Sequence, residues 1–169
     1  MQTWDAITSR RNVRSFQDRP IAAGHLDRIL EAGWRSPSSQ NWQPWDFVLV
    51  TDRDQLRELS TVFSGAYHVA ESAATIAVVG PVTDNAYHRG QLDLGQAVMA
   101  MTLAAADLGI GSCHAGVQDM AVARRVLGLP EDRTFVLLVS LGYPADRPLT
   151  PVRHPKRRAF DEVVHRGRW

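Results

Sequence analysis

The amino-acid sequence predicts one α+β domain, with a central sheet surrounded by helices. Segments with the helical period of 3.6 residues alternate with three short apolar runs of strand length, at residues 46–51, 75–79 and 135–141. The last run is continuous enough in its hydrophobicity to lie covered on both faces. The chain has 169 residues, of which 44% are hydrophobic, enough to bury a substantial core. We therefore expect a single domain over residues 1–169, with a mixed or antiparallel sheet.

Two helices are expected before the first strand. Thr3 can cap a short helix that ends near Arg10. After Pro20, apolar residues recur on one side of a second helix that runs to about Trp34. Between the first two strands, Asp52 is the expected cap of another helix.

The second half of the sequence predicts a long central helix. Residues 86–108 are rich in alanine, leucine and methionine, and Gly109 can end the helix. A further helix covers residues 119–127, before the last strand. The segment 144–156 is rich in proline and basic residues, so we expect it to run over a surface.

The composition excludes several classes of partner. Nineteen Lys and Arg balance eighteen Asp and Glu, so no global charge draws the protein to nucleic acid or to an anionic membrane. No stretch approaches the roughly eighteen apolar residues that a membrane-spanning helix needs. The single cysteine, Cys113, rules out an intrachain disulfide framework and favours a reducing, cytoplasmic location. We expect no metal site, because the histidines show no metal-binding spacing.

Two features of residues 109–114 could mislead. The run begins like a dinucleotide fingerprint, but it lacks the third glycine and follows a helix instead of a strand. Cys113 and His114 are sequence neighbours, whereas a catalytic Cys and His are spatial partners. We expect Cys113 to be a small buried residue, and no side chain to act as a catalytic nucleophile.

Two segments carry the chemistry. Arg10, Arg11 and Arg14 place three guanidinium groups where the first helix ends, an arrangement suited to a phosphate or to a solvated basic helix end. The segment 36–45 compresses hydroxyls, amides, tryptophans and prolines into one loop. Such a loop can read the polar edge of a heterocycle at low entropic cost, or can form a structured corner.

In this order, the two segments resemble the flavin-binding nitroreductase family, whose pattern is a basic R-R-S-x-R-x-F segment followed by a P-S-x-x-N-x-Q-P-W loop. Residues 108–116, 141–144 and 156–169 resemble further segments of the same family, so the resemblance covers nearly the whole chain. It implies a nitroreductase-like fold and a homodimer with two FMN sites, each built from both subunits.

The resemblance also implies a role for each site residue. Arg10, Lys156 and Arg158 would bind the FMN phosphate. Arg14 would face the N1 and O2 edge of the flavin. The other residues placed at the cofactor are Arg11 and Asn12, the backbone around Ala115 and Gly116 near flavin N5, and Pro37, Ser38, Ser39 and Asn41 from the other subunit.

Three positions depart from the family pattern. Asn12 replaces the usual serine. The region 64–88 is shorter than in typical members, so this is a short form, and His68 is its only candidate for a cation near the pyrimidine ring. His114 stands where an apolar or aromatic residue is common; it is either a substrate-pocket residue near N5 or a structural histidine beneath the flavin.

The resemblance implies an FMN-dependent oxidoreductase. It would take hydride from NADPH or NADH and then reduce a nitroaromatic, a quinone or a similar small conjugated acceptor in a ping-pong mechanism, with the flavin and no side chain carrying the chemistry. Two alternatives stay open. The protein could bind or sequester a flavin or deazaflavin with little turnover, or it could be a specialised flavoenzyme of the same fold.

Overall fold

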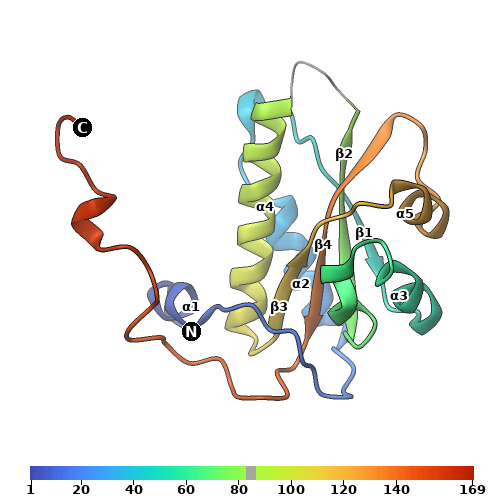
Figure 1. Cartoon of the computed structure of the whole chain (residues 1–169), viewed down its shortest axis with the longest axis horizontal. Helices are drawn as coiled ribbons and strands as arrows, with labels where there is room; N and C mark the ends of the chain where they lie inside the picture. Colours follow the sequence, from blue (N-terminus) through green and yellow to red (C-terminus); the bar gives the residue numbers. More distant parts are fainter. Residues whose placement is uncertain (83–86) are drawn as a thin grey trace.

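A computed structural model describes residues 1–82 and 87–169 and shows an antiparallel sheet between two helical layers (Figure 1). The four strands lie in the order β1-β2-β4-β3, and each pairs antiparallel with its neighbours. The strands are β1 (Asp46–Val50), β2 (Ala74–Pro81), β3 (Gly111–Ala115) and β4 (Arg133–Gly142). The helices are α1 (Thr3–Ser9), α2 (Ala23–Trp34), α3 (Arg53–Leu59), α4 (Tyr87–Asp107) and α5 (Met120–Leu127), with short 3-10 turns η1 (Ser39–Asn41), η2 (Ser64–Val69) and η3 (Phe160–Glu162).

The α+β class and most of the expected elements are confirmed, with two differences. The expected cap at Thr3 is wrong, because Thr3 is the first helical residue of α1 and Gln2 precedes it without a side-chain cap. The strand β3 was not predicted. Asp52 does cap α3, since its side chain accepts hydrogen bonds from the N–H groups of Asp54 and Gln55.

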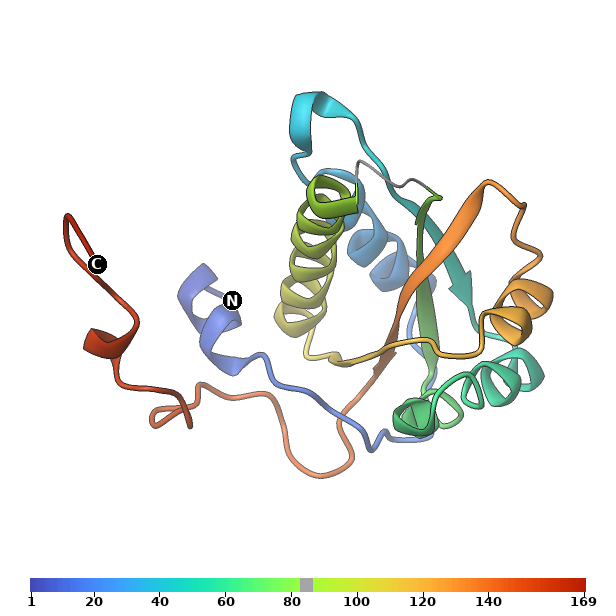
Figure 2. The same cartoon turned by 45° about the horizontal axis from the view of Figure 1, so that its top comes forward.

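Each face of the sheet has its own core. On one face α2 and α4 pack together, and Ile29 and Met101 lie fully buried against strand residues such as Ile76. On the other face α3, α5 and η2 cover Ala77 and Leu138 (Figures 1 and 2). Adjacent strand residues thus alternate between the two cores, as the period of two requires. The sheet is therefore covered on both faces.

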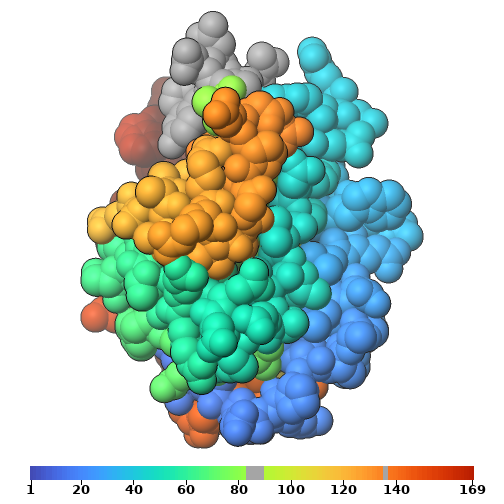
Figure 3. All heavy atoms as spheres, turned by 90° about the vertical axis from the view of Figure 1, so that its right-hand side faces the viewer, coloured from blue at the N-terminus to red at the C-terminus, as the bar shows by residue number. Residues whose placement is uncertain are grey.

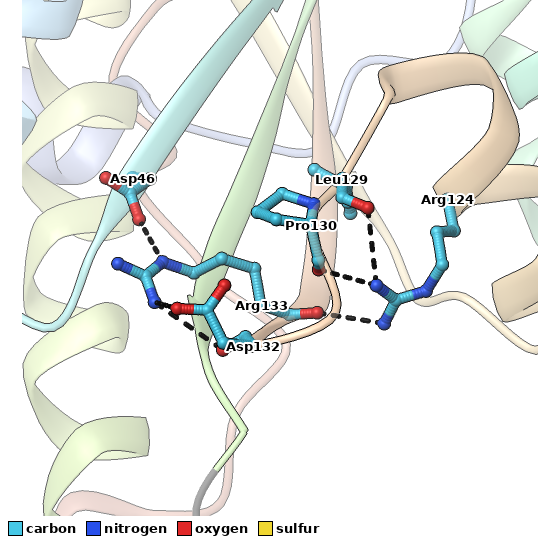
Figure 4. Close-up of polar contacts among 6 residues, drawn as sticks. All are labelled: Asp46, Arg124, Leu129, Pro130, Asp132 and Arg133. Carbon is cyan, nitrogen blue, oxygen red and sulfur yellow. Dashed lines mark hydrogen bonds and ion pairs between the residues drawn. The ribbon is translucent and has the colours of Figure 1, made fainter.

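The helices α3 and α5 form the outer surface of the helical layer that they share with η2 (Figure 3). An ion pair between Arg125 and Glu58 joins the two helices. The neighbouring Arg124 side chain points toward the segment that follows α5. Its guanidinium donates to the carbonyls of Leu129, Pro130 and Arg133 (Figure 4). These hydrogen bonds fix the connection that carries the chain from α5 into β4.

A second ionic contact ties β4 to β1. The Arg133 guanidinium lies 2.8 Å from an Asp46 carboxylate oxygen and 2.7 Å from one of Asp132 (Figure 4). These hydrogen bonds, the one to Asp46 foremost, raise the pKa of Arg133. Because all three side chains reach solvent, the pairs align the sheet edge and add little to stability.

The buried side chain of His68, on η2, contacts the sheet. His68 is 1% exposed, and its Nδ1 lies 2.7 Å from Ser140 Oγ, which in turn contacts the Cys113 carbonyl at 3.3 Å. Burial, reinforced by the charge of Arg14, lowers the pKa of His68, although the His114 backbone opposes the change. Burial and the charge of Arg10 likewise lower the pKa of His114.

These lowered pKa values predict a loss of stability on acidification. In the unfolded chain both histidines take up protons near pH 6.5, whereas the folded chain resists protonation, so the free energy of unfolding falls as the pH drops below that value. Denaturant unfolding between about pH 7.5 and 5.5 measures this slope. His68→Gln, which cannot titrate, should flatten the slope. An unchanged slope in His68→Gln would contradict this assignment.

Candidate functional site

The basic segment, residues 10–16, lies along the edge of the sheet between β3 and the end of β4. The Val13 N–H donates to the Ser112 carbonyl at 2.9 Å, and the Gln17 N–H donates to the Tyr143 carbonyl at 2.8 Å. The Ala145 N–H donates back to Ser15 at 3.1 Å. Backbone hydrogen bonds at both ends therefore hold the segment in an extended conformation.

Two glycines make room for this segment. Gly111 and Gly142 face each other in the β3–β4 register. A Cβ on Gly111 would lie 2.7 Å from Val13 Cγ2, and one on Gly142 would lie 2.6 Å from Phe16 Cδ1. Both distances are shorter than van der Waals contact, so only glycine allows Val13 and Phe16 to bury against the sheet. With Val13 buried, its neighbours Asn12 and Arg14 are exposed.

Three of the predicted residues line one pocket of about 650 Å³. Arg11, Asn12 and Arg14 form one wall. The remaining lining residues are Ser15, Tyr67, Ala70, Glu71 and Asp146. Tyr67 is 61% exposed and was missed by the sequence analysis, which considered only His68 in this region. An exposed aromatic side chain beside two arginines is a surface on which a planar ring can stack.

Arg11 also has a partner within the chain. Its Nη2 lies 2.7 Å from an Asp146 carboxylate oxygen and donates to the Arg147 carbonyl at 2.8 Å. The hydrogen bond from Arg11 holds the pKa of Asp146 below its ordinary value. Arg11 thus anchors the start of the C-terminal segment to the pocket wall.

Arg10 presents an unpaired buried donor. Within the described part of the chain, Arg10 Nη1 and His114 Nε2 are both buried without a hydrogen-bond partner, as is Ser9 Oγ. Leaving a buried charged donor unpaired is costly, so the site suits a ligand that brings an acceptor or an anion. The FMN phosphate that the resemblance implies fits this requirement.

The two predicted halves of the site lie far apart in one chain. Ser39 contacts Asp93 near the beginning of α4. The N-terminal amine, just before α1, contacts Asp107 at the end of α4, fourteen residues further on. At 1.5 Å per residue, these attachment points are separated by about 20 Å along the helix. Within one chain, the loop thus lies near one end of α4 and the start of α1 lies near the other.

The C-terminal segment extends away from the body as an arm, residues 147–169 (Figures 1 and 2). The Val152 N–H donates to the Thr8 carbonyl at 3.0 Å, which brings the arm beside the end of α1. Lys156 and Arg158 follow and are exposed, and the Arg158 guanidinium donates to the Glu162 carbonyl at 3.0 Å. The structure thus places the arm near Arg10 without joining the three cations.

The remaining candidates lie on β3 and η2. Ala115 is buried at the end of β3, and the exposed Gly116 follows it. Burial raises the pKa of the Cys113 thiol, which makes it a poor nucleophile. His68 is buried against Ser140, and burial lowers its pKa, which disfavours the charged form; its place near the pyrimidine ring stays a prediction.

In residues 1–82 and 87–169, no cluster of His, Cys, Asp and Glu side chains could hold a metal ion. None of the helices described is both long enough and apolar enough to cross a bilayer.

Comparison with known proteins gives consistent matches. The model of the nitroreductase family matches residues 7–82 and 64–143. A protein of Archaeoglobus fulgidus named "Putative NADH dehydrogenase/NAD(P)H nitroreductase" is 33% identical over 169 residues, which cover 96% of each chain. The NADPH-flavin oxidoreductase of Vibrio harveyi is 28% identical, over 99% of this chain and 74% of its own length.

A solved structure shares the fold. The FMN-dependent nitroreductase of Clostridium difficile superimposes with a TM-score of 0.86 at 23% identity, over 97% of this chain and 98% of its own. The family match spans most of the chain, and the relative from Archaeoglobus is similar from end to end. The chain belongs to the nitroreductase family.

Proposed function

We propose that this protein is an FMN-dependent oxidoreductase, which takes electrons from NADH or NADPH and passes them to a small conjugated acceptor such as a nitroaromatic or a quinone. Relatives named as NAD(P)H nitroreductases and flavin oxidoreductases support this proposal. FMN, when bound, supplies the group that accepts and donates hydride. The protein supplies position, charge and exclusion of water, in a ping-pong cycle in which both reactants use one slot.

The observation that carries the proposal is the buried Nη1 of the half-buried Arg10, which has no hydrogen-bond partner among the described residues. A planar guanidinium binds phosphate through two parallel hydrogen bonds, and burial strengthens them. Lys156 and Arg158, on the arm that passes the end of α1, would complete the phosphate site.

The other residues would orient the ring system. Arg14 would stabilise negative charge at the N1 and O2 edge, and the backbone at Ala115 and Gly116 would contact N5. Arg11 and Asn12 would line the flavin from the same pocket wall. His68 and His114 remain candidates for the surroundings of the acceptor, both as neutral groups at pH 7.

We infer that the protein is a homodimer in which the loop of one subunit reaches the basic segment of the other. The separation of about 20 Å along α4 between the loop and the start of α1 supports a site that is completed by a second copy. Leu92 and Met99, which are seven residues apart and share one face of α4, are exposed, as is Phe160 on the arm. Such a dimer should bury more than roughly 2,000 Å².

Charge favours the same arrangement. Residues 147–169 carry seven Lys and Arg against two Asp and Glu, whereas residues 1–146 carry twelve against sixteen. The basic arm of one copy is therefore attracted to the acidic body of another.

Spectroscopy tests the activity directly. The protein, purified with FMN, should show a flavin absorption spectrum that bleaches during anaerobic titration with NADH or NADPH, before any acceptor is added. A subsequent addition of a quinone should restore the spectrum. Tight flavin binding with no bleaching by either nicotinamide would contradict turnover and would favour the flavin-sequestering alternative.

The phosphate assignment predicts a selective loss of affinity. Arg10→Ala should weaken FMN binding by about 2 kcal/mol, the range for a charge-assisted hydrogen bond, and should weaken riboflavin binding much less. Fluorescence titration measures both. Arg35→Ala, which removes an exposed cation from the end of α2, serves as the control. Equal losses for the two ligands in Arg10→Ala would remove the phosphate assignment.

A further inference from the structure

A buried carboxylate on α4 holds the proline-serine-asparagine loop. Asp93 is 1% exposed, and it was not among the residues expected at the site. The Ser39 N–H lies 3.1 Å from each of the two Asp93 carboxylate oxygens, and the Ser39 hydroxyl lies 3.4 Å from one of them. Trp42 lies against the same helix, one turn earlier, at Gly90. The loop thus contacts α4 at two points, Ser39 and Trp42.

The loop needs this attachment because its backbone is strained. Gln40, Asn41 and Gln43 have φ angles of 54°, 57° and 53°, in the left-handed region that residues other than glycine rarely adopt. Three such residues within four positions persist only where the surroundings impose the conformation.

Two further hydrogen bonds within the loop complete its shape. The Ser38 hydroxyl accepts from the Gln43 N–H at 2.9 Å, and the Gln43 side-chain amide donates to the Asn41 carbonyl at 3.1 Å. The outer surface of the loop, residues 40–43, remains exposed. A rigid and exposed loop of this kind is ready to contact another molecule without further ordering.

We propose that Asp93 is a positioning residue, whose carboxylate fixes the loop 38–43 in the shape that contacts the flavin bound to the other subunit. This inference rests on the proposed FMN site and on the homodimer. Asp93 itself touches no cofactor. It acts through Ser39, so its removal lowers the fraction of molecules with a binding-competent loop, and the apparent FMN affinity falls in proportion.

Two substitutions of Asp93 should weaken FMN binding to different degrees. Asp93→Ala removes both acceptors, and FMN affinity should fall at least about tenfold. Asp93→Asn keeps one oxygen that can accept from Ser39, so its loss should be smaller. Thr102→Val is the matched control, since Thr102 is also buried on α4 but its hydroxyl bonds to Met99 within the helix. The control should bind FMN as the unaltered protein does.

Hydrogen exchange separates loop positioning from a general loss of stability. In the protein without FMN, Asp93→Ala should exchange faster in a peptide covering residues 37–45, while peptides from β2 and β4 keep their protection. Thr102→Val should not change the loop peptide. Unchanged exchange of this peptide in both Asp93 variants would overturn the anchoring role.

Mixed dimers test which subunit the loop serves. A dimer of one Arg10→Ala subunit and one Asp93→Ala subunit should contain one intact FMN site, because Arg10 of the second subunit meets the unaltered loop of the first. Two different affinity tags allow the mixed dimer to be purified and titrated with FMN. One tight site per mixed dimer is expected, whereas neither parental homodimer should have any.

The outcomes are distinguishable. If the unaltered protein binds no FMN, the proposed function fails, and hydrogen exchange alone still decides whether Asp93 anchors the loop. If the unaltered protein binds FMN but both Asp93 variants bind it equally well, the positioning role is overturned. If affinity falls but the mixed dimer regains no tight site, the loop serves its own subunit and the inference across the interface is overturned.

Discussion

The close approach of Val13 and Phe16 to a pair of facing glycines is the constraint on which the site depends. Gly111 and Gly142 leave no side chain where β3 meets β4, and this gap lets the basic segment lie flat on the sheet edge. A larger residue at either position would lift the segment by about the width of a methyl group. Arg14 and Asn12 would then lose their fixed place at the pocket wall, although their own chemistry would be unchanged.

A second constraint is the length of α4. The helix is 21 residues long, and it holds the loop near one end and α1 near the other. Its rigidity keeps these two ends apart, which supports the proposed site between two subunits. The arm, residues 147–169, extends from the body and exposes apolar and basic side chains. Both features fit the homodimer proposed above.

The sequence predicted the elements that have strong local signals. The helices α2 and α4 show clear apolar periodicity, and β1, β2 and β4 are continuous apolar runs. The strand β3 has the sequence G-S-C-H-A, with no β-branched or aromatic residue, so its local signal is weak. It forms because β4 offers it a partner edge and because its glycine admits Val13.

For the site, residue types were predictable but environments were not. Arg11, Asn12 and Arg14 could be found by motif, and they do share a pocket. The lowered pKa of His68 depends on its burial between η2 and the sheet, and the role of Asp93 depends on a contact across 54 positions of the chain. Neither carries a local pattern, since a lone histidine or aspartate is compatible with many environments.

Replacing Gly111 with alanine tests the central constraint most directly, with Gly24→Ala as the control. A Cβ on Gly24, in the first turn of α2, would meet nothing within 4 Å, so this variant should be as stable as the unaltered protein or slightly more stable. Gly111→Ala should lose about 1–3 kcal/mol of stability through overlap with Val13. At temperatures where it is still folded, Gly111→Ala should also bind FMN more weakly, with both losses absent in Gly24→Ala. A folded Gly111→Ala protein that binds FMN as tightly as the unaltered protein would contradict the account.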